Sequence, residues 1–319
     1  MLSAESSSPF VIETSDLSRS FSTYKKKEGL WNSIKGLWNR ETVQRVALQP
    51  TNLKIEPGQI VGLVGANGAG KTTLLKLLSG LISPTTGTAR VLGFNPHDRE
   101  AAFLKQISLL LGQKNQLWWD ITPLDSYALL TEIYDLDKEK AQKKVQELAT
   151  LLHCRHVLET QLRRLSLGER MKMEIIGALL HSPKILFLDE PTIGLDIVAQ
   201  ETIREFLAAY VKNKGPTVIL TSHYMDDIAR LADRLLLISK GQIVYDGTVE
   251  GFVDRADEIQ TITYKIHGEN ENKVEIKKSE LSAFLKDLTQ KGQLESIKIE
   301  ETDFEDVIHN FLQKESRLF

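Results

Sequence analysis

The sequence has little cysteine and no long apolar run. Its one cysteine, Cys154, excludes an internal disulfide framework and is typical of a reducing compartment. No apolar run approaches the roughly 20 residues needed to cross a bilayer, and the longest candidates, such as Ile107 to Leu111, have the length of core strands. Met1 to Phe10 lacks the basic start and apolar core of a signal peptide. We therefore expect a soluble chain whose membrane role comes through a partner.

An excess of charge of either sign is also missing. The net charge of −3 and the pI near 6.2 leave no nucleic-acid footprint on the chain as a whole, so we expect no nucleic-acid partner. The 319 residues fit one large domain with an appendage, or two domains.

A glycine-rich loop is the strongest feature that is present. It reads Gly65-Ala66-Asn67-Gly68-Ala69-Gly70-Lys71-Thr72-Thr73, after the apolar run Ile60–Val64 and before Leu74–Leu78. Such a loop between a strand and a helix points successive backbone N–H groups at a phosphate, and the helix N-terminus adds roughly half a positive charge. Lys71 reaches the β- and γ-phosphates, and the Thr72 hydroxyl suits Mg²⁺. A glycine-rich turn without a ligand would need neither the lysine nor the hydroxyl, so we predict a nucleoside triphosphate site.

Two carboxylates end a later apolar strand, Leu186-Phe187-Leu188. Asp189 is placed to hold Mg²⁺ opposite Thr72, and Glu190 is free to polarise a water for attack on the γ-phosphate. An Asp-Glu pair at a strand end is usually a solvated turn. Downstream of a phosphate loop, the pair favours catalysis.

Two further strand ends carry candidate catalytic groups. His223 follows the predicted strand Thr217–Thr221, where an imidazole can donate to the γ-phosphate and orient the attacking water. Gln113 follows Leu109–Leu111 and offers a neutral amide for Mg²⁺ or the water, with Gln116 as a competitor. Alone, a histidine after a strand is more often structural.

A second anion site is predicted where an apolar helix begins. Ser166 suits the N-cap of the helix that continues through Met171 to Leu180, and Glu169 stands at capping-box spacing, with Gly168 between them. The plain alternative is a well-capped helix. One γ-phosphate cannot easily reach this site and Lys71 within a single subunit, because the helical region intervenes.

The pattern along the chain predicts an α/β fold with a largely parallel sheet. Residues 9–62 alternate β-like segments with turns, residues 96–182 are mostly helical in pattern, and buried-strand runs follow near 185–188, 218–220 and 235–238. Residues 24–45 form a basic, tryptophan-bearing insertion, which either folds against its own domain or touches lipid headgroups or a membrane partner. We expect the first domain to span 9–250 and a small α+β accessory domain to span 252–319.

In this order, the motifs resemble those of an ATP-binding-cassette (ABC) nucleotide-binding domain over residues 9–250. The resemblance implies a P-loop NTPase with a parallel-sheet core, an antiparallel β-subdomain and an inserted helical subdomain. It implies two such domains enclosing two ATPs with Mg²⁺, each ATP held by Lys71 of one subunit and by Ser166, Gly168 and Glu169 of the other. By the same resemblance, Asp196 belongs to the loop that couples the two sites.

The resemblance also assigns an adenine-stacking aromatic, which Phe21 fits best, with Tyr24 as the runner-up. The chain departs from the family signature Leu-Ser-Gly-Gly-Gln, because Leu167 replaces the first glycine and Glu169 the glutamine. The phosphate-contacting serine and second glycine remain, so we expect activity.

The segment Gly112-Gln113-Lys114-Asn115-Gln116-Leu117-Trp118-Trp119-Asp120 and the insertion look like the ATPase subunits of ABC-2 and drug exporters. We therefore expect an ATPase, peripheral on the cytoplasmic membrane face, homodimeric, and bound to separate transmembrane permease subunits. Trp118 and Trp119 are expected to grip that partner; burial is the alternative. An importer ATPase and a soluble ABC-type mechanochemical switch are the other candidates.

Overall fold

The structure is a computed structural model that describes residues 8–24, 42–112, 114–256, 259–267, 270–291, 293–300, 308 and 311. Two compact units divide the chain, residues 1–246 and residues 247–319. Most of the insertion expected at residues 24–45 lies outside the described residues, including Trp31 and Trp38.

A six-stranded sheet forms the core of the first unit. In the order β10-β9-β4-β8-β7-β6 it contains β4 (Ile60–Val64), β6 (Ile107–Leu111), β7 (Ile185–Asp189), β8 (Thr217–Thr221), β9 (Arg234–Ser239) and β10 (Gln242–Thr248). The pairings among β9, β4, β8, β7 and β6 are all parallel. Every residue of β4 and β8 is buried, which explains their unbroken apolar runs. The carboxyl ends of these five strands therefore meet at one edge.

An antiparallel sheet makes a second layer of this unit. β1 (Ile12–Tyr24) pairs antiparallel with β2 (Thr42–Thr51), β3 (Lys54–Ile55) and β5 (Thr86–Val91). The two sheets share one hydrophobic core that includes Ile12 and Leu48 from the antiparallel layer and Leu63 and Phe187 from the parallel one.

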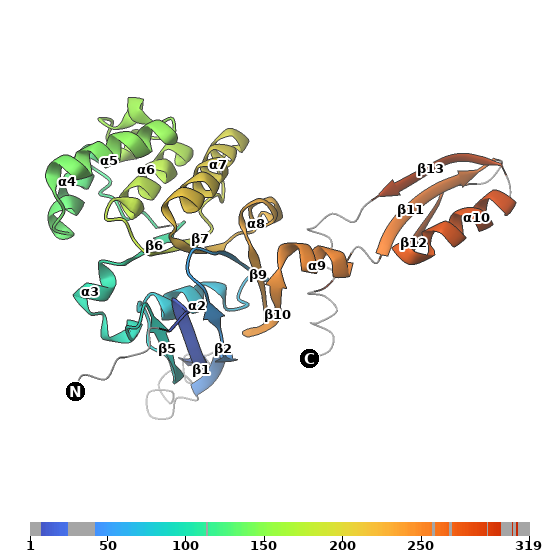
Figure 1. The fold of residues 1–319 in the computed structure, drawn as a ribbon, viewed down its shortest axis with the longest axis horizontal. Coiled ribbons are helices and arrows are strands. Elements are labelled where there is room, and N and C mark those ends of the chain that lie inside the picture. Colours follow the sequence, from blue (N-terminus) through green and yellow to red (C-terminus); the bar gives the residue numbers. More distant parts are fainter. Residues whose placement is uncertain are drawn as a thin grey trace, which may run out of the picture. The chain divides into compact units, whose positions relative to one another are not determined.

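The described helices of the first unit pack around the parallel sheet, and three of them form a cluster at one end. The described helices are α2 (Lys71–Leu78), α3 (Ala101–Leu104), α4 (Pro123–Ile133), α5 (Lys138–Leu151), α6 (Leu167–Leu179), α7 (Ile197–Lys214) and α8 (Met225–Leu231). In Figure 1, α4, α5 and α6 (green) lie together at one end of this unit, whereas β1, β2 and β5 (blue to teal) lie at the other. The region expected to be helical also contributes β6, which pairs with β7 in the core sheet.

The second unit is a small α+β fold. Its sheet has the order β12-β11-β13, with β11 (Ile259–Ile266) antiparallel to both β12 (Asn272–Lys277) and β13 (Leu294–Glu300). Its described residues include the helices α9 (Val249–Ala256) and α10 (Leu281–Lys291). The Phe284 ring of α10 meets Tyr264 of β11 edge to face, with centroids 5.7 Å apart. Ile262 and Leu288 are buried in its core.

Candidate functional site

The glycine-rich loop takes a backbone shape that side chains would block. Gly70 has φ +117°, and a Cβ there would lie 2.5 Å from the carbonyl oxygen of Ala47; a Cβ on Gly65 would lie 2.2 Å from that of Ile238. Gly68 also has a positive φ, +78°. Only glycine accommodates these conformations and close approaches. The loop is therefore a cradle of backbone N–H groups at the N-terminus of α2, which fits a phosphate.

Lys71 is the buried cation of this cradle. Its Nζ donates to the carbonyl oxygens of Gly65 at 2.6 Å and Ala66 at 3.3 Å, and only 5% of the residue is exposed. Burial lowers the pKa of Lys71, and the nearby charges of Glu190 and Asp189 oppose that lowering. An ammonium held against weak carbonyl acceptors is poised to exchange them for a phosphate, which is a stronger partner.

Asp189 joins three elements at the carboxyl edge of the sheet. The Thr72 hydroxyl of α2 donates to its Oδ2 at 2.9 Å, and the Thr221 hydroxyl of β8 donates to its Oδ1 at 2.7 Å. The predicted Mg²⁺ ligands Thr72 and Asp189 thus lie side by side. Hydroxyl and carboxylate oxygens are the ligand atoms that Mg²⁺ prefers, so the pair fits that ion. Thr221 was not singled out from the sequence.

Glu190 is turned away from Asp189 by the backbone. It has φ +57°, a left-handed conformation that is uncommon for a residue with a side chain, and its N–H donates to the Thr221 hydroxyl at 3.1 Å. Its carboxylate Oε1 lies 2.8 Å from Nε2 of His223, and 16% of the Glu190 side chain is exposed. The two consecutive carboxylates therefore have different partners: Asp189 contacts the Thr72 hydroxyl, and Glu190 contacts the His223 imidazole.

The segment after Gln113 is held by a buried carboxylate. Gln113 itself lies outside the described residues, so its predicted role stays a prediction. Glu174 of α6 accepts hydrogen bonds from the N–H groups of Gln116, at 3.0 Å, and Leu117, at 3.2 Å. Burial raises the pKa of Glu174 to about 7, although these two bonds lower it. This anchor was not predicted from the sequence, because Glu174 is one of several charged residues in the first half of α6.

The signature residues form a capping box at the start of α6, as their spacing predicted. Ser166 donates through its hydroxyl to Oε2 of Glu169 at 2.8 Å, and the Glu169 N–H donates back to the Ser166 hydroxyl at 3.3 Å. The Ser166 N–H also donates to Oε2 of Glu169, at 2.9 Å, and this bond, followed by that from the Ser166 hydroxyl, lowers the pKa of Glu169. His156 Nε2 lies 3.7 Å from Oε1 of Glu169. Ser166 and Glu169 thus contact each other, and Glu169 also lies beside His156. The phosphate loop lies at the start of a different helix, α2. Gly168 is buried against Ala199 of α7.

Phe21 lies near the phosphate loop through the pairing of β1 with β2. It is 37% exposed, the Arg19 guanidinium lies over its ring at 4.7 Å, and its partner across the strands is Arg45. A Cβ on Gly68 would lie 3.3 Å from Nη2 of Arg45, so this guanidinium stands beside the loop. Our sequence analysis missed Arg45, since only the strand register brings it there. Of the other loop residues, Asn67 is exposed and Thr73 lies in the first turn of α2, which begins at Lys71.

Comparisons with known proteins agree on one family. The family model "ABC transporter" matches residues 48–193. The ABC transporter ATP-binding protein NatA of Bacillus subtilis is 31% identical over 208 residues, which cover 65% of this chain and 84% of the relative. The chain belongs to the ABC transporter ATP-binding proteins. As a member of that family it is an ATPase that binds ATP and works with transporter subunits in the membrane.

Two other relatives are named for a drug resistance and for the import of an amino acid. The doxorubicin resistance ATP-binding protein DrrA of Mycobacterium tuberculosis strain H37Rv is 32% identical, over 66% of this chain and 63% of the relative. The methionine import ATP-binding protein MetN of Latilactobacillus sakei is 31% identical, over 68% and 64%. The solved dimeric, ADP- and Pi-bound ATP-binding cassette MJ0796 has a similar fold, with a TM-score of 0.62 at 22% identity over 74% of this chain and 98% of that one.

The described helices include none that is long and apolar enough to cross a membrane. Apolar side chains are nevertheless exposed near the segment that follows Gln113. Trp118 and Trp119 are each 42% exposed, and the Arg170 guanidinium lies 4.9 Å over the ring of Trp119. The tryptophan pair is thus partly on the surface, beside the helix that carries the signature residues.

The raised pKa of Glu174 predicts a pH dependence of stability. Its stabilising contribution, which needs the proton, is complete below about pH 4.5 and is lost as the pH rises through about 7. Relative to a Glu174→Gln variant, wild type should lose on the order of 2 kcal/mol of unfolding free energy between about pH 5 and pH 8. Urea unfolding at a series of pH values measures this. The exposed control Glu139→Gln should show no such trend; a pH-independent difference between Glu174→Gln and wild type contradicts it.

Proposed function

We propose that this chain powers a membrane exporter by closing and reopening a homodimer around two ATPs. The observation that carries the proposal is the convergence of Lys71, the Thr72–Asp189 pair and the Glu190–His223 pair at one edge of the parallel sheet. Phosphoryl transfer to water needs these parts together: a cation on the phosphates, oxygen ligands for Mg²⁺, and an acid–base pair for the attacking water.

The roles follow from the contacts. Lys71 leaves its loop carbonyls for the β- and γ-phosphates of ATP. Glu190 polarises the attacking water, and His223 orients the water and Glu190 through the 2.8 Å contact. Thr72 and Asp189, with Gln113, would hold Mg²⁺, which when bound neutralises charge developing on the phosphates.

The adenine and ribose end of ATP belongs beside the antiparallel sheet. Phe21 stacks on the adenine with the ring face that Arg19 leaves open, because the other face already carries the guanidinium. Arg45 adds positive charge next to Gly68 and so favours the phosphates.

The second half of each site comes from a second copy of the chain. Ser166 is exposed at the N-terminus of α6, where backbone N–H groups and Gly168 suit a γ-phosphate. For this, Ser166 exchanges its bond with Glu169 for the phosphate. The Glu169 carboxylate, in place of a glutamine, stays with His156 and away from the anion.

Separate transmembrane permease subunits are the partner, which places the chain at the cytoplasmic face of the membrane. Export is supported by the likeness to DrrA and by the sequence of residues 112–120, whereas the likeness to MetN supports the alternative, import. We take residues 252–319 as an accessory domain. A soluble mechanochemical switch is the remaining candidate, and it would bring no polytopic chain with it.

Replacing the proposed base should separate hydrolysis from binding. Glu190→Gln should lower the rate of phosphate release by at least about 100-fold, since general-base catalysis contributes that much, and leave ATP affinity within about threefold. Phosphate release and ATP titration calorimetry measure the two. The exposed Glu205→Gln on α7 is the matched control and should behave as wild type. Wild-type turnover in Glu190→Gln would refute the assigned mechanism.

The tryptophan pair should be needed for the membrane partner. Tagged wild-type chain, purified from detergent-solubilised membranes, should bring a polytopic chain with it, and Trp118→Ala with Trp119→Ala should lose it, because aromatic residues dominate interface energies. Leu151→Ala, an exposed apolar residue on α5, is the control that should retain it. Unchanged co-purification by the folded double variant contradicts the assigned contact, and absence of any polytopic chain with wild type favours the soluble switch.

A further inference from the structure

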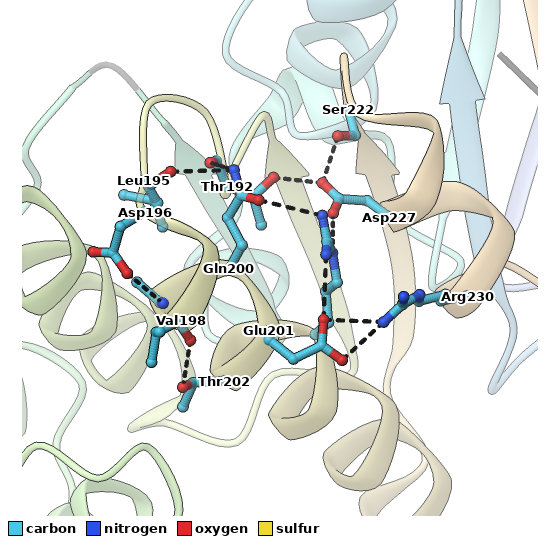
Figure 2. Close-up of polar contacts among 12 residues, drawn as sticks. Thr192, Leu195, Asp196, Val198, Gln200, Glu201, Thr202, Ser222, Asp227 and Arg230 are labelled. Atoms are coloured by element: carbon cyan, nitrogen blue, oxygen red, sulfur yellow. Dashed lines mark hydrogen bonds and ion pairs between the residues drawn. The ribbon is translucent and has the colours of Figure 1, made fainter.

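One carboxylate behind the candidate site is wholly buried. Asp227 of α8 is 0% exposed, and carboxylates are rarely buried unless they are paired. Its Oδ2 accepts hydrogen bonds from the hydroxyls of Thr192 and Ser222, the latter at 2.5 Å, and its Oδ1 accepts one from Nε of Arg204 at 2.5 Å. Figure 2 shows Asp227 between Thr192 and Ser222.

The partners of Asp227 lie next to the two proposed catalytic groups. Thr192 stands two residues after Glu190, and Ser222 directly precedes His223. The Ser222 hydroxyl also accepts the N–H of the residue after His223, Tyr224, at 3.0 Å, so His223 is fixed on both sides. One carboxylate therefore ties together the two segments whose side chains meet at 2.8 Å.

The same network extends to the loop that precedes α7. Gln200 donates from Nε2 to the carbonyl oxygens of Thr192 at 3.3 Å and Leu195 at 3.2 Å. Asp196 then caps α7 by accepting the N–H of Ala199 at 2.9 Å, and these contacts are visible in Figure 2. Beyond the cap, Ile197 is 80% exposed. The polar network thus runs from the His223 segment to the start of α7, where the apolar Ile197 is exposed.

We propose that Asp227 is a positioning residue for ATP hydrolysis, which holds His223 against Glu190 and ties both to the loop at residues 194–196. The inference rests on the proposed function, in which Glu190 and His223 act on the attacking water. Asp227 acts through its donors Thr192 and Ser222. The competing view is that Asp227 with Arg204 is a core ion pair that stabilises the fold and nothing else.

A double-mutant cycle separates positioning from stabilisation. Asp227→Asn keeps the side-chain shape and should lower kcat about tenfold while the KM for MgATP stays within about threefold. In a His223→Ala background the same change should lower kcat by less than about twofold, because the group that Asp227 positions is already gone. A purely structural role predicts the same loss in both backgrounds. Single-turnover assays with radiolabelled ATP and excess protein measure the slow variants.

A matched control and gentler variants keep the test decisive. Asp226→Asn changes the neighbouring, exposed carboxylate of α8 and should leave kcat unchanged. If Asp227→Asn fails to fold because Arg204 loses its ion pair with Asp227, Ser222→Ala and Thr192→Val each remove one donor and keep that ion pair. Each should lower kcat in the wild-type background and have almost no effect with His223→Ala.

Each outcome has one meaning. Unchanged kcat in folded Asp227→Asn, or in both single-donor variants, overturns the inference, as do losses that are equal in the two backgrounds. Wild-type turnover in His223→Ala also overturns it, since Asp227 would have nothing to position. Wild-type turnover in Glu190→Gln instead overturns the proposed function, so the two failures are distinguishable.

Discussion

The carboxylate of Asp189 is the contact on which the site depends. Because β4, β8 and β7 are parallel neighbours, their carboxyl ends meet, and Asp189 bonds there to Thr72 beside the phosphate loop and to Thr221 at the end of β8. The same end of β7 turns Glu190 through a left-handed backbone conformation towards His223. The sheet thus brings three distant sequence segments into one arrangement suited to phosphoryl transfer.

Behind this edge, two buried carboxylates hold neighbouring segments together. Asp227 joins the segments of Glu190 and His223, and Glu174 joins α6 to the segment that follows Gln113. Each accepts hydrogen bonds from the segments that it joins, as a buried polar group must. Movement of these segments against one another would therefore lengthen or break the hydrogen bonds of Asp227 and Glu174.

The sequence predicts the local chemistry better than the long-range contacts. The phosphate loop and the capping box are local signals, since glycine conformation and the i, i+3 spacing of Ser166 and Glu169 depend on neighbours in sequence. Arg45 was missed because the β1–β2 register alone brings it beside Gly68. Nothing local distinguishes Asp227, which is buried, from the exposed Asp226. Glu174 was missed for a similar reason, because Glu169, Arg170 and Lys172 also carry charge in α6.

The central claim is that each ATP site is completed by a second copy of the chain. The direct measurement is the mass of Glu190→Gln in solution by light scattering, with MgATP and with MgADP. With MgADP the protein should be a monomer of about 36 kDa, and with MgATP it should have twice that mass. When Ser166 is also replaced by a larger acidic residue, the protein should remain a monomer with MgATP. A monomer that binds MgATP tightly, or a dimer indifferent to the nucleotide and to Ser166, would contradict it.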